Sequence, residues 1–369
     1  MNVGFILFGF ALIFAVLYDT FATIILPRSV DRDRRLTNYF YLAVGRLWRW
    51  VGKRLPYGSQ GRTEWLGAFG PLSVILLVAL WAVLLIVGFA LVHFGAGTLK
   101  GADFFTTFYF SGTTFLTIGF GDMTSTTTLG RSLSIVEGGT GFGFLAIVLG
   151  YIPVLYQSFS RREHLVLLLD ARAGSNPSAG EIWRRYSEAG ALDDLCDFLK
   201  EWELWSAQQL ETYLSYPIVA FYRSQHDDQS WVTAITCILD LCTLIQDCVV
   251  PVDPWSKKLR FQAANTFAMA RHMIVDLAYI LSIPPQSQPF DRLTPERKHT
   301  LERILRQSGV VMQEDVDWSF SKQRDLYEPY AIGLAKTMFC VLPDWTSYDE
   351  AQDHWQVTAW DNPHFRAGN

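Results

Sequence analysis

The segment Thr117-Ile118-Gly119-Phe120-Gly121-Asp122 is the part of the sequence whose residue types and spacing best support a chemical function. Its two glycines, two residues apart, can adopt positive φ, which lets successive backbone carbonyl groups turn toward one axis. One chain cannot surround an ion in this way. Four chains can, because they present rings of carbonyl oxygens, and a ring of threonine hydroxyls, that replace the water shell of a dehydrated monovalent cation. We therefore predict cation-binding oxygens at Thr117, Ile118, Gly119, Phe120 and Gly121.

The residues ahead of this segment, 102–116, are aromatic and apolar but too few to cross a membrane. We predict a short re-entrant helix over 102–116, because non-helical backbone at membrane depth is tolerated only where it lines a water-filled path or is buried in protein. The negative C-terminal end of such a helix would favour a cation in a central cavity. Thr113, Thr114 and Asp122 flank the cation-binding segment and are candidates for supporting it.

Three apolar stretches are long enough to position these elements in a membrane. The stretch 65–92 holds 28 residues without a charge, and 133–160 is interrupted only by Glu137. About 20 residues suffice to cross the hydrocarbon core. The stretch 2–26 is apolar except for Asp19 and lacks the features of a cleaved signal peptide, so we expect a third, retained span.

The loop between the first two spans, 27–64, predicts their orientation. It contains nine basic residues against three acidic ones. By the positive-inside rule this loop is cytoplasmic, which places the N-terminus outside and everything after residue 160 inside. Four apolar residues recur within it at helical spacing, and three basic residues fall on another side: Phe40, Val44, Leu47 and Val51, with Arg46, Arg49 and Lys53. A helix of this kind lies along the inner membrane face or packs against another helix.

The order of these features resembles the tetrameric potassium channels, whose signature is T-x-G-Y-G-D or T-x-G-F-G-D. Span, re-entrant helix, signature and span follow one another as in that family, and Gly130-Arg131 stands where the inner helix opens. The resemblance covers about 65–162 and looks like a bacterial two-span pore with an extra N-terminal helix. It implies an all-α membrane protein, a homotetramer in the plasma membrane, and passive potassium conduction. Potassium would bind at Thr117, Ile118, Gly119 and Phe120 as the permeant ion, without a cofactor.

Three positions depart from the family pattern. Phe120 replaces the usual tyrosine, Leu116 stands where a second threonine is common, and Thr113 occupies a position that is acidic in some relatives. These changes leave the carbonyl ladder intact but keep a non-selective cation channel open as an alternative. An alternative from another class is a membrane-anchored receptor or enzyme with a vestigial pore.

Two acidic residues and several small residues lie inside the predicted spans. Intramembrane charges point to function by default. Glu137 is expected to hydrogen-bond the re-entrant helix, either as a protonation-dependent support of the filter or as a static anchor, and Asp19 is expected to pair with a basic residue of the following loop. Gly141, Gly150 and Pro153 indicate either a gating hinge in the inner helix or close helix packing.

Residues 161–369 have a different composition, with 20 basic and 29 acidic residues against 11 and 7 in residues 1–160. The excess of acidic residues argues against nucleic-acid binding. Helices are predicted over 193–204, 230–249, 259–283 and 296–307, the last beginning at Thr294-Pro295. The five cysteines all lie here, and we interpret them as reduced thiols of a cytoplasmic domain.

No nucleotide-binding or catalytic motif is found in this half, so we predict no enzyme activity. A cytoplasmic ligand is left unidentified. The candidates are the segment 222–226, and two acidic pairs that are more often solvated surface, Asp193-Asp194 and Asp227-Asp228 beside His226. The predicted organisation is an N-terminal span (1–26), a basic loop (27–64), a pore domain (65–160) and a helical cytoplasmic domain (161–369). Within the pore domain we expect an outer helix over 65–94, the filter over 117–122 and an inner helix over 131–160.

Overall fold

The computed structural model describes residues 2–26, 35–56, 60–224, 229–288, 290–346 and 353. Within these residues every regular element is a helix, apart from one isolated bridge between Val249 and Met312. The all-α class predicted from the sequence is confirmed for this part of the chain. The chain divides into two compact units, 1–157 and 158–369.

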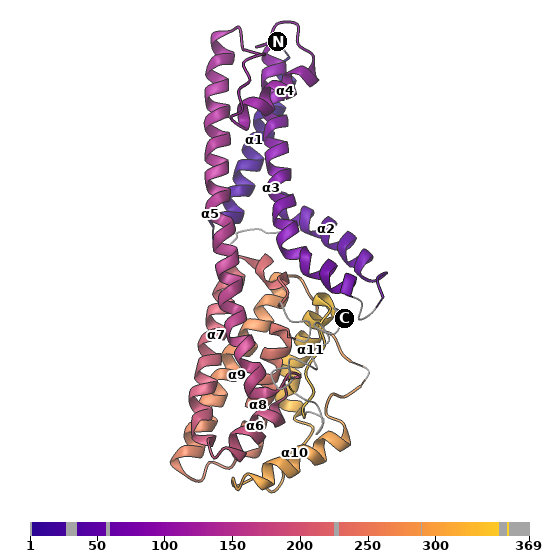
Figure 1. The fold of residues 1–369 in the computed structure, drawn as a ribbon, viewed down its shortest axis with the longest axis vertical. Coiled ribbons are helices and arrows are strands. Elements are labelled where there is room, and N and C mark those ends of the chain that lie inside the picture. Colours follow the sequence, from indigo (N-terminus) through magenta and orange to yellow (C-terminus); the bar gives the residue numbers. More distant parts are fainter. Residues whose placement is uncertain are drawn as a thin grey trace, which may run out of the picture. The chain divides into compact units, whose positions relative to one another are not determined.

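The first unit contains α1 (Val3–Ile24), α2 (Leu36–Gly52), α3 (Gln60–Ala96), α4 (Phe104–Phe115) and the first part of α5 (Thr128–Ala173). Figure 1 shows α1 running beside α3, with the short α4 near one end of both. The backbones of α1 and α3 approach closely where glycines face each other. A Cβ atom on Gly9 would lie 2.6 Å from the carbonyl oxygen of Gly88, so this contact requires glycine, as is common between membrane helices.

The inner helix is longer than its apolar stretch indicated. We expected it over 131–160, but α5 begins at Thr128 and ends at Ala173. The sequence after the apolar stretch, RREHLVLLLDARA, contains neither proline nor glycine, so nothing stops the helix when its composition becomes polar. It ends where Gly174 adopts a φ of +85°, the left-handed conformation that terminates many helices.

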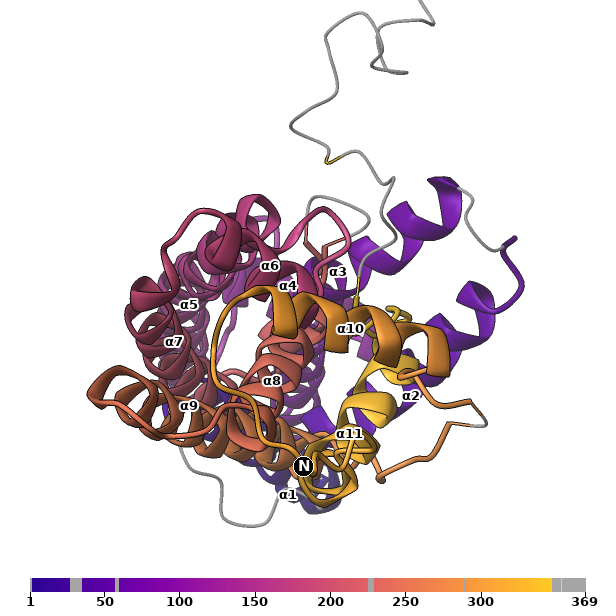
Figure 2. The ribbon, with the colours of Figure 1, turned by 90° about the horizontal axis from the view of Figure 1, so that it is seen from below.

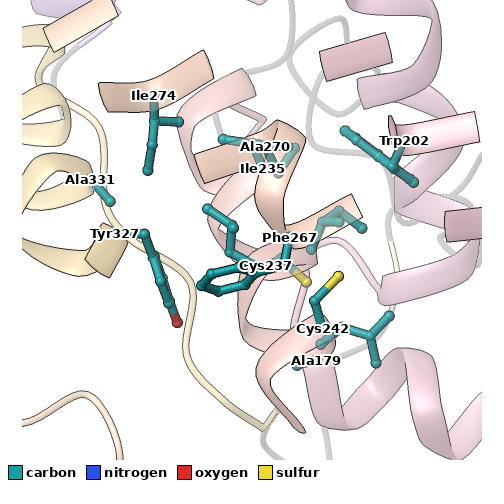
Figure 3. Packing of buried hydrophobic residues seen from close by; sticks show 14 of the residues in the cluster. Ala179, Trp202, Ile235, Cys237, Cys242, Phe267, Ala270, Ile274, Tyr327 and Ala331 are labelled. Carbon is teal, nitrogen blue, oxygen red and sulfur yellow. The ribbon is translucent and has the colours of Figure 1, made fainter. Parts of the chain in front are cut away.

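The second unit contains the rest of α5, two short 3-10 helices and six further helices. These are η2 (Leu192–Asp194), η3 (Pro217–Phe221), α6 (Ala179–Glu188), α7 (Leu195–Ser215), α8 (Trp231–Cys248), α9 (Pro254–Ile280), α10 (Pro295–Gln307) and α11 (Ser321–Met338). Figure 2 shows α8 among α6, α7, α9 and α11. Figure 3 shows Trp202 of α7, Cys237 of α8, Phe267 of α9 and Tyr327 of α11 in this shared core.

Four described helices are long and apolar enough to cross a membrane, namely α1, residues 61–96 of α3, α5 and α8. The fourth has another explanation, because 89% of α8 is already buried by the protein itself. A helix that is apolar on all sides is typical of a domain core as well as of a membrane span. We therefore assign α8 to the core of the second unit, as the sequence predicted for 230–249.

A buried network of charges joins three elements of the second unit. Asp240 of α8 is fully buried and accepts two hydrogen bonds from Arg292, at 2.8 and 2.9 Å. The Nε of Arg292 donates to Glu328 of α11 at 2.6 Å, and the hydroxyl of Tyr327 donates to Asp240. Such a pair is costly to break, because the remaining charge would stay buried without a partner. Asp240, Arg292 and Glu328 lie far apart in the sequence, and no pattern there predicted this network.

Candidate cation site

Helix α4, at the place of the predicted pore helix, ends in a turn whose carbonyl groups accept hydrogen bonds from the start of the predicted filter. The backbone amides of Ile118 and Gly119 both donate to the carbonyl oxygen of Thr113, at 2.8 and 3.2 Å. The amide of Thr117 donates to the carbonyl oxygen of Thr114 at 3.1 Å. Thr113 and Thr114, two of the predicted supporting residues, therefore contact the filter through their backbones. The filter cannot turn independently of the end of α4.

The filter backbone alternates in conformation. Thr117, Gly119 and Gly121 have φ values of +54°, +58° and +80°, and the residues between them do not have positive φ. In a regular strand successive carbonyl groups point to opposite sides; reversing the sign of φ at every second residue allows them to face one side. Positive φ at the two glycines confirms the prediction from the sequence.

Positive φ at Thr117 was not predicted, because a β-branched residue rarely adopts it. Such a conformation costs of order 1–3 kcal/mol and is found mainly at functional sites, where the surroundings enforce it. Here the hydrogen bonds from the end of α4 provide that constraint. The sequence carries no signal for positive φ at Thr117. Threonine at this position indicates only a hydroxyl ligand.

The C-terminal end of the predicted filter is hydrogen-bonded to α4. The hydroxyl of Tyr109 in α4 donates to Asp122 at 3.0 Å. Asp122 was predicted as a supporting residue, but Tyr109 was not identified. The apolar side chains between the two ends are exposed in the single chain, with Ile118 at 50% and Phe120 at 69%. No described residue of the chain covers these two side chains.

Behind the filter, Glu137 of α5 is fully buried against the pore helix. Its carboxylate forms a hydrogen bond with the hydroxyl of Ser111, so the predicted contact between Glu137 and the re-entrant helix is present. Its second oxygen lies 3.3 Å from Nε2 of His93 in α3. The other ring nitrogen of His93 lies 2.8 Å from the hydroxyl of Thr98. His93 and Ser111 were not identified from the sequence, since each is an ordinary residue in an apolar stretch.

The protons of this cluster can be counted. The hydroxyl of Ser111 also lies 2.9 Å from the carbonyl oxygen of Ile86, which can only accept. A serine hydroxyl has one proton, so Ser111 cannot donate to Ile86 and to Glu137 at once. Both contacts are satisfied together when the carboxyl group carries a proton and donates to Ser111. The cluster therefore links α3, α4 and α5 through hydrogen bonds whose pattern depends on where one proton resides.

The two glycines named as hinge candidates have different surroundings. A Cβ atom on Gly141 would lie 1.8 Å from the carbonyl oxygen of Phe115, at the end of α4, whereas a Cβ atom on Gly150 would have no atom within 4 Å. At Gly141 close packing of the inner helix on the pore helix therefore requires glycine. Pro153 lies inside α5 without ending it.

Asp19 has partners other than the basic residue that we expected. Its carboxylate accepts hydrogen bonds from the hydroxyl and the amide of Thr37, at 2.6 and 3.2 Å, and from the indole of Trp81 at 2.9 Å. Among the described residues its partners are thus uncharged, while three basic residues of the loop, Arg28, Arg32 and Arg34, lie outside the described residues. Thr37 lies in the first turn of α2, where free amides and the helix dipole stabilise an anion without a basic side chain.

The structure gives no support to the residues that were candidates for binding a cytoplasmic ligand. Asp193 and Asp194 are exposed at the end of η2. The carbonyl oxygen of Tyr222 accepts a hydrogen bond from the buried Arg162 at 2.5 Å, while 225–228, with His226 and both later aspartates, lie outside the described residues. In the part of the chain that is described, no three His, Cys, Asp or Glu side chains are grouped as metal ligands. All five cysteines are free thiols, and four are buried.

One comparison with known proteins identifies the segment around this site. Residues 76–157, which include most of α3, the pore helix, the filter and the adjoining part of α5, match a family described as ion channel. The chain therefore contains an ion channel domain in a membrane protein, and it is a channel, not an enzyme. Neither the search of curated proteins nor that of solved structures gave a match.

Proposed function

We propose that the protein is a potassium-selective channel that conducts passively through a homotetrameric pore. The observation that carries this proposal is the alternation of φ at Thr117, Gly119 and Gly121. It favours carbonyl groups facing one side over five residues, and four such ladders around an axis provide the oxygen cages of a dehydrated cation. Each chain contributes one ladder, so the function requires assembly.

The tetramer is supported by the surface that a single chain leaves open. Apolar side chains of the filter and of α5 are more than half exposed, including Phe120, Ile135, Phe142 and Leu149. Neighbouring copies would cover the filter and part of α5, and lipid would cover the rest. We place this pore in the plasma membrane, with the second unit in the cytoplasm, where it would assist assembly and gating.

A non-selective cation channel is the second candidate, because of Leu116. This residue follows the last residue of α4 and has a side chain that is 55% exposed. A hydroxyl at this position would add an oxygen ligand at the inner end of the filter, and leucine supplies none. The filter backbone is the same in both candidates, so selectivity has to be measured.

A flux assay on lipid vesicles tests the proposal. Vesicles loaded with potassium and holding the purified chain should release it down its gradient, and Gly119→Asp should abolish the release. Any side chain at Gly119 is strained by its φ of +58°, and a charged one would also occupy the conduction path. The control is that the variant assembles into the same oligomer, measured by cross-linking. Release by assembled Gly119→Asp would contradict the filter assignment.

A further inference from the structure

The helix α2 presents one face that no described residue of the chain covers. Its opposite face is fixed to the two neighbouring helices of the first unit. At its start, the hydroxyl and the amide of Thr37 donate to Asp19 of α1. Further along, the ring of Trp48 stacks on that of Trp65 in α3, with centroids 3.9 Å apart and planes inclined by 13°. The helix is therefore anchored to the ends of two helices that are long and apolar enough to span a membrane.

The uncovered face combines four cations with four large aromatic or aliphatic side chains. The cations are Arg46, Arg49, Lys53 and Arg54, and the other side chains are Tyr39, Leu42, Leu47 and Trp50. All eight are exposed, with Leu47 at 61% and Trp50 at 55%. The helical spacing predicted Leu47 on one apolar side with Phe40, Val44 and Val51, but in the structure it lies on the exposed face with the cations.

The charge of this face is of one sign. Residues 35–56 contain no Asp or Glu, and none of the four cations forms an ion pair with a described residue. The guanidinium of Arg54 lies 3.3 Å from the ring centroid of Trp50, which neutralises no charge. Four like charges on one helix repel one another, and an anion bound between them relieves that repulsion.

We propose that this face of α2 binds the headgroups of anionic phospholipids. The anchors of α2 hold it at the membrane surface, where cations reach phosphate groups while tryptophan, tyrosine and leucine enter the boundary between headgroups and acyl chains. Basic segments next to a membrane span are attracted to anionic lipid, and each lysine or arginine near the surface adds to that attraction. The proposal rests on α1 and α3 being membrane spans, and on no statement about conduction.

The test measures lipid binding by the full chain in neutral detergent micelles. Dioctanoyl phosphatidylglycerol is added, and the half-saturating concentration is read from the rise in melting temperature. Replacing all four cations (R46Q, R49Q, K53Q and R54Q together) should raise this concentration at least tenfold. The exchange of three arginines for lysine (R46K, R49K and R54K together) should change it less than threefold, because the charge is kept.

A matched variant controls for net charge. Lys200, Lys257, Lys258 and Lys322 are four exposed cations of the second unit, and their joint replacement by glutamine should leave the half-saturating concentration within twofold. Dioctanoyl phosphatidylcholine and inorganic phosphate should give no comparable rise in melting temperature.

Three results would overturn the proposal. An unchanged half-saturating concentration in the α2 variant would show that the lipid binds elsewhere. An equal increase of the half-saturating concentration in both fourfold variants would mean that only the net charge of the protein matters. An equal rise in melting temperature with inorganic phosphate would indicate a site for a free anion. Since no readout is a current, failure here is distinct from failure of the proposed channel function.

Discussion

The carboxylate of Glu137 on the inner helix is hydrogen-bonded to the hydroxyl of Ser111 on the pore helix, and both side chains are fully buried. The contact lies behind the filter, whose first residues are themselves bonded to the end of the same pore helix. A movement of the Glu137 carboxyl group can therefore be transmitted to the filter through these two sets of hydrogen bonds. If residues 117–121 line the conduction path, as proposed, Glu137 is a positioning residue for that path.

Replacing Glu137 by glutamine should alter gating and leave selectivity unchanged. An amide keeps a permanent donor toward Ser111, whereas a carboxyl group gains and loses a proton that it shares with Ser111 and faces His93. We expect the open probability of the native channel to vary with pH and that of Glu137→Gln to vary less, at the same reversal potential. Single-channel recording between pH 5 and 8 measures both. Identical pH profiles would leave Glu137 as a static anchor.

A pair of glycine substitutions separates close packing from hinge bending in the inner helix. Gly141→Ala places a methyl group 1.8 Å from the carbonyl oxygen of Phe115, whereas Gly150→Ala meets no atom within 4 Å. If packing on the pore helix is the requirement, Gly141→Ala should destabilise the protein and reduce current, and Gly150→Ala should leave both close to the native values. The melting temperature and the macroscopic current of both variants distinguish close packing from hinge bending. Equal loss of current at both sites, without loss of stability, would instead indicate a hinge.

Removal of the Asp19 carboxylate should loosen the junction of the first three helices. Asp19→Ala leaves the amide of Thr37 and the buried indole of Trp81 without their acceptor, whereas the hydroxyl of Thr37 still lies 3.1 Å from that of Thr23. An unsatisfied buried donor costs about 1–3 kcal/mol. The milder control, Trp81→Phe, removes one donor and keeps the carboxylate with its other partner. Thermal unfolding of both variants should show the larger loss for Asp19→Ala, and the reverse order would contradict the assigned contacts.

The buried ion pair of the second unit should tolerate loss of both partners better than loss of one. Arg292→Met leaves Asp240 buried beside the hydroxyl of Tyr327, and breaking such a pair costs about 3–5 kcal/mol. Adding Asp240→Asn removes the uncompensated charge and should restore part of the lost melting temperature. A double variant that is less stable than Arg292→Met would mean that the two residues act independently.

The helix ends that could be predicted from the sequence were those marked by a local signal such as a capping residue. The start of α10 at Thr294-Pro295 was identified from its cap residue, and the hydroxyl of Thr294 does cap that helix. The same signal stands at Asp253-Pro254, where Asp253 and Ser256 form a capping box, but we had placed the start of that helix later, at 259. Helix α11 has no such signal, because Phe320 precedes it in a left-handed conformation and Pro329 lies inside it.

The candidate site was predictable where the chemistry lies in the backbone and less so where it depends on tertiary contacts. The two glycines of the filter predict its positive φ values. By contrast, the partners His93 and Ser111 lie on different helices and are 18 residues or more away in the chain from each other and from Glu137. Their types are unremarkable, so only the fold identifies them. Asp19 shows the same limit, since its charge gave no indication of its contacts with Thr37 at the start of α2 and with Trp81.

The reversal potential of the purified protein in a planar bilayer, under opposed potassium and sodium gradients, tests the central claim most directly. If four filters with the alternating backbone of Thr117, Gly119 and Gly121 form the conduction path, the current should reverse near the potassium equilibrium potential. Reversal near zero would contradict potassium selectivity and favour the non-selective channel, with Leu116→Thr as the first variant to restore an oxygen ligand.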